Sequence, residues 1–273
     1  MCAIFGVGFQ RGCKICNNKM VREIIRNLFL ENMVRGRTAS GLAYVSDKEI
    51  QVIKKNIAAC DFIQLPAYKK SNFTYLKMSN SKDSINPEHQ PVSVLGHCRL
   101  KTKGTELNNV NNHPIVRNNI VGVHNGMIIN DDYLFTHYAD KFKRNGKVDS
   151  EIIFALIEHY SGTNGAIVGA IQKANQEIYG GFACAMVHRF QPYIVWLFRN
   201  NNPCSIFHYK DSGLVIWSSM PQFIRSATKG YTLGEPEEIE FPAETGIAID
   251  LYQNKFYRFK LKDQGKETNA GVH

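Results

Sequence analysis

The order of hydrophobic and polar residues predicts β-strands, then a pair of helices, then further strands. Residues 2–9 form an apolar run typical of a strand. A helix is predicted next, because one helical face collects Met20, Val21, Ile24, Ile25, Leu28 and Phe29. Short apolar segments between polar Asn, Asp, Gly and Pro residues predict strands at 41–46, 50–55, 92–98 and 120–124.

The second half of the chain repeats this pattern after two helices. Apolar residues at helical spacing predict helices over 150–160 and about 164–174. Strand signals then return, with a short helix near 221–227, at 182–188, 193–198, 205–209, 213–218, 246–250 and 255–259. Their hairpin-like spacing favours antiparallel pairing. We expect one domain over residues 1–260 and a flexible tail over 261–273.

Composition narrows the class of protein. Of 273 residues, 44% are hydrophobic, yet no apolar run approaches the length of a membrane span. The first residues lack the pattern of a secretory signal, which predicts a cytoplasmic location and reduced thiols. Cys13 and Cys16 form a lone CxxC without a second ligand pair, so we expect no metal site.

The formal net charge of +9 allows an acidic or nucleic-acid partner. Charge is the only reason to propose one. The lysines are spread along the chain, and no known nucleic-acid-binding motif accompanies them.

The position of Cys2 would allow this residue to supply both a nucleophile and a base. Removal of Met1 would leave a thiol and a free α-amine on one residue. An α-amine has an ordinary pKa of about 7.7–8.0, so near neutral pH a useful fraction can accept the thiol proton. Chance cysteines at position 2 are common, and this residue alone does not establish catalysis.

Five segments in order give Cys2 its context: Cys-Ala-Ile-Phe-Gly at 2–6, Arg-Gly-Arg-Thr-Ala-Ser-Gly at 35–41, Gly-His-Cys-Arg-Leu-Lys-Thr at 96–102, His-Asn-Gly at 124–126 and Asp-Ser-Glu at 149–151. Together they resemble the class II glutamine amidotransferase domain, a glutaminase of the N-terminal-nucleophile hydrolase type. The resemblance runs from the second residue to about residue 250. It implies an α+β fold, a four-layer αββα sandwich of two antiparallel sheets flanked by helices.

The resemblance also implies catalytic roles. Cys2 would be the nucleophile that attacks the side-chain amide of glutamine, with its own amine as base. Asn125, through its side-chain amide, and Gly126, through its backbone N–H, would form the oxyanion hole. The thioester intermediate would be hydrolysed without a cofactor or metal.

The resemblance assigns the substrate-binding roles to other residues. Arg99 would bind the α-carboxylate of glutamine and Asp149 its α-ammonium group, while Thr102 lines the pocket and Arg35 supports it. Taken without the resemblance, the same residues have structural interpretations. Asp149 precedes an amphipathic run and fits a helix N-cap, and Arg99 fits a surface arginine at a strand end.

Further residues near these motifs also have structural interpretations. Asn125-Gly126 fits a two-residue hairpin turn. Three histidines adjoin apolar strands and fit hydrogen-bonded structural residues rather than metal ligands, namely His97, His113 and His124.

Three positions depart from the family pattern. Ala3 replaces a glycine, and Leu100 and Lys103 stand where the sugar-phosphate enzymes carry an aromatic residue and a histidine. These departures mean that the substrate gating and the contacts between domains found in the sugar-phosphate enzymes are not expected to carry over unchanged. The residues assigned to catalysis are all present.

These features lead to three functional hypotheses. In the first, the chain is a glutaminase subunit that releases ammonia for a separate synthase-type acceptor protein, because the sequence ends where the glutaminase domain would end. In the second, it is a stand-alone amidohydrolase for a γ-glutamyl or related amide. In the third, it is a catalytically silent binding or assembly protein with the same fold.

Overall fold

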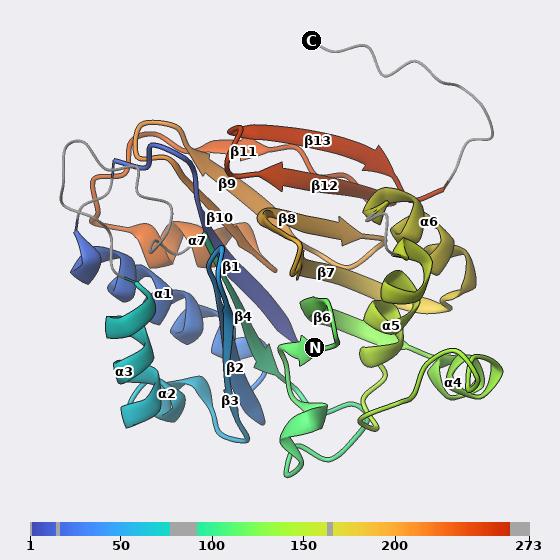
Figure 1. The fold of residues 1–273 in the computed structure, drawn as a ribbon. Helices are drawn as coiled ribbons and strands as arrows, with labels where there is room; N and C mark the ends of the chain where they lie inside the picture. Colours follow the sequence, from blue (N-terminus) through green and yellow to red (C-terminus); the bar gives the residue numbers. More distant parts are fainter. Residues whose placement is uncertain (1, 15–16, 77–91, 163–165, 263–273) are drawn as a thin grey trace.

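Two antiparallel β-sheets form the centre of the molecule, a computed structural model that describes residues 2–14, 17–76, 92–162 and 166–262 (Figure 1). The seven-stranded sheet has the order β11-β9-β10-β1-β4-β2-β3. Its strands are β1 (Ala3–Phe9), β2 (Ala39–Val45), β3 (Ile50–Lys55), β4 (Ser93–Arg99), β9 (Ser205–Tyr209), β10 (Leu214–Ser218) and β11 (Glu237–Ile239).

The six-stranded sheet has the order β13-β12-β8-β7-β6-β5. Its strands are β5 (Ile115–Val116), β6 (Ile120–Ile128), β7 (Gly180–His188), β8 (Gln191–Arg199), β12 (Thr245–Asp250) and β13 (Lys255–Lys260). Every pairing recorded in both sheets is antiparallel, as the hairpin-like spacing predicted.

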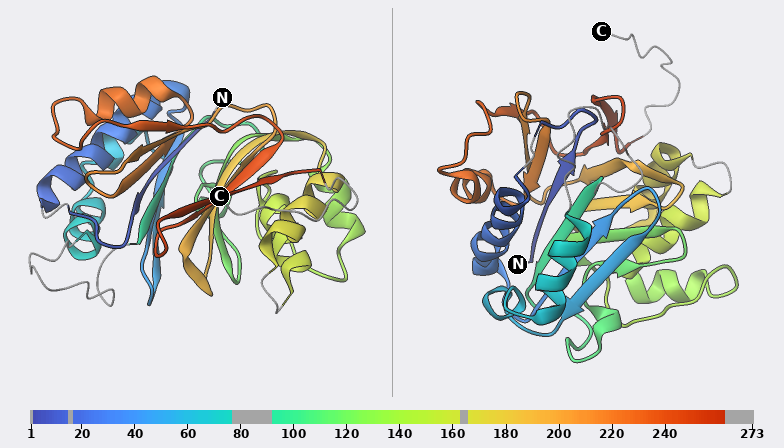
Figure 2. Two further views of the ribbon diagram at one scale, coloured as in Figure 1. Left: turned by 90° about the horizontal axis from the view of Figure 1, so that it is seen from above. Right: turned by 60° about the vertical axis from the view of Figure 1, so that its left-hand side comes forward.

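Helices cover the outer face of each sheet (Figure 2). The seven-stranded sheet is covered by α1 (Asn18–Asn32), α2 (Ala59–Phe62), α3 (Pro66–Tyr75) and α7 (Pro221–Thr228). The six-stranded sheet is covered by α4 (Asp131–His137), α5 (Glu151–Ser161) and α6 (Ile167–Glu177). The layers therefore run helix, sheet, sheet, helix, which confirms the predicted αββα sandwich.

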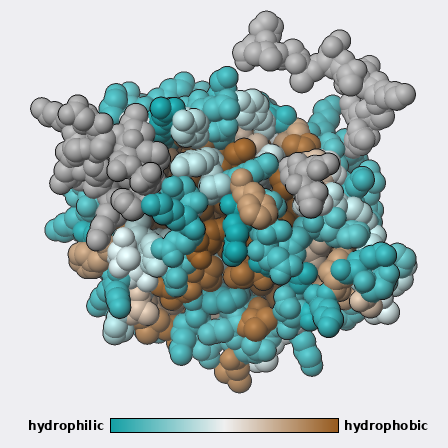
Figure 3. Space-filling view, viewed as in Figure 1, coloured by the Kyte–Doolittle hydropathy of each residue, from teal (hydrophilic) through white to brown (hydrophobic). Residues whose placement is uncertain are grey.

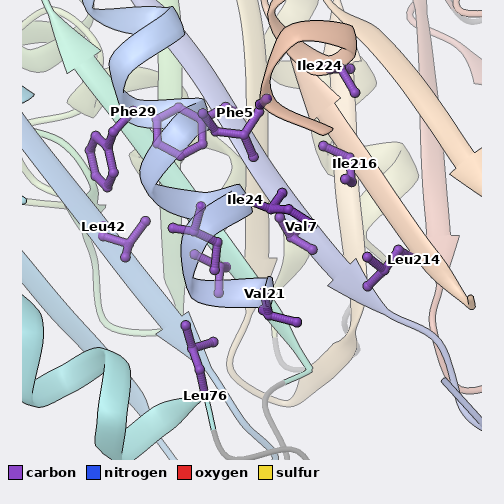
Figure 4. Packing of buried hydrophobic residues seen from close by; sticks show 14 of the residues in the cluster. Phe5, Val7, Val21, Ile24, Phe29, Leu42, Leu76, Leu214, Ile216 and Ile224 are labelled. Atoms are coloured by element: carbon purple, nitrogen blue, oxygen red, sulfur yellow. The ribbon is translucent and has the colours of Figure 1, made fainter. Parts of the chain in front are cut away.

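Three hydrophobic cores hold these layers together. One lies between the seven-stranded sheet and its helices, where Phe5, Val7, Ile24 and Phe29 pack together (Figure 4). A second lies between the two sheets, and the third lies beneath α5 and α6. Every residue of β1 is buried because this strand has packed layers on both sides, which explains its unbroken apolar run.

The apolar pattern predicted the long elements correctly and missed several short ones. The predicted strand at 2–9 and helices at 150–160 and 221–227 correspond to β1, α5 and α7. The short helices α2, α3 and α4 were not predicted. Asn125-Gly126 lies within β6 and pairs with β7, so its interpretation as a hairpin turn is wrong.

The predicted end of the domain needs one correction. Leu261, assigned to the flexible tail, is fully buried in the core beneath α5 and α6, and its N–H donates to the Glu244 carbonyl at 3.0 Å. The packed chain therefore extends past residue 260. Residues 263–273 of the expected tail lie outside the described residues.

Among the helices in the described part of the chain, none combines the length and apolar character needed to cross a bilayer.

The contact between β1 and its surroundings leaves no room for a larger side chain at Gly6. A Cβ atom there would lie 2.1 Å from the Trp217 ring and 2.3 Å from the Val94 carbonyl oxygen. We expect Gly6→Ala to lower the free energy of unfolding by about 1–3 kcal/mol, because the backbone oxygen cannot rotate away. Urea denaturation measures this change.

Gly169 in α6 provides a matched control for this substitution. No heavy atom lies within 4 Å of a Cβ atom built there. Gly169→Ala should raise the free energy of unfolding by about 0.5–1 kcal/mol, because alanine loses less backbone entropy in a helix. Equal effects of the two substitutions would contradict the proposed tight packing around β1.

Candidate active site

Cys2 lies at the start of β1, beside the end of β4. Its Sγ donates to the Leu100 carbonyl oxygen at 3.2 Å and accepts from the Leu100 N–H at 3.4 Å. The Cys2 carbonyl oxygen accepts a hydrogen bond from Nε of Arg35 at 3.1 Å. Leu100 and Arg35 therefore hold Cys2, the nucleophile predicted from the sequence, from two sides.

The environment of Cys2 keeps its thiol protonated. Burial raises the pKa of Cys2, while the hydrogen bond from Leu100 and the charge of Arg99 oppose that shift. The residue is 6% exposed. A nucleophilic role for this thiol consequently requires a nearby base to accept its proton.

Arg99 is a buried cation that has no carboxylate partner among the described residues. It is 2% exposed, so its interpretation as a surface arginine is wrong. Its Nη1 donates to Oδ1 of Asn112 at 2.7 Å, and its Nη2 donates to the carbonyl oxygens of Lys103 and Gly104 at 2.7 and 2.8 Å. All three acceptors are neutral, and no ion pair of Arg99 occurs among the described residues.

Asp149 is a buried anion, and like Arg99 it has no ion-pair partner among the described residues. It is 1% exposed, and its Oδ2 accepts from the Ile128 N–H at 2.7 Å. No described cation lies within ion-pair distance of its carboxylate. The N-cap interpretation of Asp149 is also wrong, because the N-cap of α5 is Ser150 and the Asp149 carboxylate is bound to β6.

Asn125 and Gly126 lie together on β6. Both polar atoms of the Asn125 side chain are buried and have no hydrogen-bond partner among the described residues. Gly126 has a φ of +153°, and a Cβ atom there would lie 1.9 Å from the Gly181 carbonyl oxygen. This position therefore requires glycine, and the neighbouring amide retains its full capacity to bind a ligand.

Thr102 is placed differently from the other predicted residues. It is exposed in the loop after β4, and no hydrogen bond recorded for the described residues connects it to the predicted catalytic side chains. In contrast, β1 and β4 both contact β6, the strand that carries Asn125, and the charges of Arg99 and Asp149 both act on the Cys2 thiol. In Figure 1 the start of β1 lies beside β6, between the two sheets.

Three further residues shape the site and were not predicted. Asn112 is fully buried and binds Arg99, while Nζ of Lys54 donates to the carbonyl oxygens of Asn112 and Pro114 at 2.7 and 2.9 Å. Asp131, also buried, accepts from Nζ of Lys103 at 2.7 Å. No sequence pattern indicated these roles, because Asn112 lies in a polar loop that is far from Lys54 along the chain.

Three histidines form a buried layer behind Asn125. The rings of His97 and His113 stack with centroids 4.1 Å apart, and Nε2 of His97 donates to the His124 carbonyl oxygen at 3.0 Å. His124 is hydrogen-bonded to Ser150 through Nδ1, at 2.7 Å. Neither ring nitrogen of His113 has a partner among the described residues, so only two of the three fit the expected hydrogen-bonded role.

This histidine layer does not hold a metal ion in its observed geometry. No group of three or more His, Cys, Asp or Glu side chains among the described residues is arranged to bind one. Cys16 of the CxxC pair lies outside the described residues, and Cys13 is partly buried.

Hydrophobic residues gather on one face of the molecule. Figure 3 shows hydrophobic residues gathered near the centre of the face viewed in Figure 1, with hydrophilic residues around them. Leu100 and Met127, which flank the predicted catalytic residues in the sequence, are 41% and 51% exposed. The site therefore opens on a partly apolar surface.

Comparison with known proteins identifies the class of domain. Residues 97–226 match the family model described as "Glutamine amidotransferase domain". Glutamine–fructose-6-phosphate aminotransferase [isomerizing] of Buchnera aphidicola is 27% identical over 197 residues, covering 67% of this chain and 28% of the relative. The enzyme of the same name from Shouchella clausii is 21% identical over 280 residues, covering 100% and 42%.

A solved structure supports the same fold. Glutamine phosphoribosylpyrophosphate amidotransferase from B. subtilis, complexed with ADP and GMP, aligns with a TM-score of 0.66 and 14% identity, over 96% of this chain and 50% of the other. Over residues 97–226 the chain matches a glutamine amidotransferase domain, and its fold is that of the class II, N-terminal-nucleophile type. It spans less than half the length of these curated relatives.

The buried histidines should make the protein sensitive to acid. Burial lowers the pKa of His97 to about 3, and it also lowers the pKa values of His113 and His124. Between pH 6.5 and 3 the unfolded chain binds protons that the folded chain excludes. The free energy of unfolding should therefore fall as pH falls below 6.5, by up to about 1.4 kcal/mol per pH unit for each histidine.

Chemical denaturation between pH 7.5 and 5 measures this dependence. His113→Phe should reduce the slope, because it removes a titrating ring whose nitrogens have no hydrogen-bond partner among the described residues. The matched control is His137→Gln, which changes an exposed histidine outside this buried layer. The same slope in His113→Phe and in the parent protein would contradict this account.

Proposed function

We propose that the chain hydrolyses the side-chain amide of glutamine, with Cys2 as the nucleophile after removal of Met1. The observation that carries this proposal is the pair of unmatched buried charges, Arg99 and Asp149. Burying a charge without a partner is costly, so a ligand that neutralises both is favoured. The α-carboxylate and α-ammonium groups of glutamine have the required opposite charges.

The chemistry follows from the groups around Cys2. Its α-amine accepts the thiol proton, Sγ attacks the amide carbon, and the carbonyl oxygen becomes an oxyanion. The Asn125 side chain and the Gly126 N–H would stabilise that oxyanion, and one such donor contributes about 2.7–4 kcal/mol in comparable sites. The C–N bond then breaks, ammonia leaves with the proton from the amine, and water hydrolyses the thioester to glutamate.

We also propose that a separate acceptor enzyme uses the released ammonia. Support comes from the relatives, whose names describe transfer of an amino group rather than simple hydrolysis. The matched region covers less than half of each relative, so their transfer activity is not assigned to this chain. Ammonia release at full rate by the purified protein alone would count against a dedicated acceptor.

A glutamine-mimicking electrophile tests the nucleophile directly. Treatment with 6-diazo-5-oxo-L-norleucine should add one adduct to Cys2 in protein that has lost Met1, as measured by intact mass and peptide mapping. Cys2→Ala should form no adduct. Cys60→Ala, a change at an exposed thiol, should react like the parent protein. Processed protein that remains unmodified would defeat the proposal and favour a non-catalytic binding protein.

The role of Asp149 can be tested with a substrate that lacks the α-amino group. Asp149→Asn keeps an acceptor for the Ile128 N–H but removes the charge. It should lower kcat/KM for glutamine at least about 30-fold, because a buried charge pair is lost. Glutaramic acid, which is glutamine without its amino group, should change less than about threefold.

The matched control is Asp140→Asn, which changes an exposed carboxylate. It should affect neither substrate. Equal losses for glutamine and glutaramic acid in Asp149→Asn would show that Asp149 acts through the fold instead of binding the ammonium group.

A further inference from the structure

A cavity adjoins Cys2, and none of the residues proposed to bind the amino-acid end of glutamine lines it. It has a volume of about 470 Å³ and is lined by Val34, Arg35, Gly36, Arg37, Thr38 and Leu100. Two of these residues contact Cys2, namely Arg35 through the Cys2 carbonyl and Leu100 through Sγ. The cavity is large enough for a small molecule.

The cavity lies apart from the groups proposed to bind the amino-acid end of glutamine. Neither Arg99 nor Asp149 lines it. The guanidinium of Arg99 instead binds Asn112 and the carbonyl oxygens of the loop at Lys103. Leu100 both contacts Sγ of Cys2 and lines the cavity, so the cavity adjoins the atom at which a leaving group would depart from the substrate.

The lining of the cavity is partly cationic and partly apolar. It contains two guanidinium groups and no carboxylate, with Val34 and Leu100 as its apolar part. Arg37 is exposed and forms no ion pair within the described ranges of the chain. Ammonia, the leaving group of glutamine, is too small to fill this cavity and has no negative charge to pair with a guanidinium group. An anionic leaving group with an apolar portion fits them.

We propose that this cavity, the leaving-group pocket, binds an α-amino acid whose nitrogen is joined to the γ-carboxyl group of glutamate. The carboxylate of that amino acid pairs with Arg37, and its side chain contacts Val34 and Leu100. The substrate class is therefore γ-glutamyl dipeptides in addition to glutamine. This inference rests on the proposed function, because it uses the same nucleophile and the same site for the glutamyl end.

The reaction with a dipeptide is balanced in the same way as that with glutamine. Sγ of Cys2 forms a bond to the γ-carbonyl carbon while the C–N bond to the second amino acid breaks. The leaving nitrogen takes the proton that the Cys2 α-amine removed from the thiol. Water then hydrolyses the thioester, so one dipeptide and one water give glutamate and a free amino acid.

Two substrates that differ only in the leaving-group carboxylate test the pocket. They are γ-glutamyl-leucine and γ-glutamyl-leucinamide, and the measurement is the ratio of their kcat/KM values. The parent protein should favour the dipeptide about three- to tenfold, and Arg37→Gln should bring the ratio close to one. A general loss of activity cancels in this ratio.

Two further variants make the result specific to the pocket. Val34→Glu, at a position that is 67% exposed, should also lower the ratio because the added carboxylate repels that of the substrate. Arg189→Gln removes an exposed arginine outside the pocket and should leave the ratio unchanged.

The possible outcomes separate the two proposals. Glutamine hydrolysis without hydrolysis of γ-glutamyl-leucine, or a ratio that Arg37→Gln leaves unchanged, would overturn the leaving-group pocket while the glutaminase stands. Failure to hydrolyse any of the three substrates, together with no adduct at Cys2, would overturn both.

Discussion

The buried guanidinium of Arg99 is the constraint on which the candidate site depends. Its donors are satisfied by Asn112 and by the carbonyl oxygens of Lys103 and Gly104, so the loop after β4 must fold back over the end of the strand. Lys54 holds the same loop from β3 through the Asn112 carbonyl. These hydrogen bonds meet the directional needs of the cation but leave its charge without a counterion among the described residues.

The surroundings preserve that uncompensated charge. Burial lowers the pKa values of His97, His113 and His124, so these neighbours are neutral near pH 7 and add no further positive charge. Asp149, the nearby buried anion, binds a backbone N–H instead of a cation. Because this cation and this anion do not pair with each other, a zwitterionic ligand can neutralise both of them.

The hydrophobic pattern predicted the long strands and helices because they bury a regular face, as β1 and α5 do. The family resemblance, carried by ordered motifs, predicted the sandwich and the domain class that the comparisons confirm. Local rules failed at Asn125-Gly126, which resembles a turn but continues a strand. They also failed at Asp149, because the carboxylate binds β6 instead of capping its own helix.

The sequence by itself determined the identity and order of the reactive groups, the strands that carry them and the class of domain. Only the tertiary structure decided which polar groups are left without partners, since that depends on contacts between distant segments. Asn112 and Lys54 are 58 residues apart along the chain, yet together they shape the loop around Arg99. Burial, which raises the cost of an unpaired charge, is a property of the packed sheets and cannot be read from any local pattern.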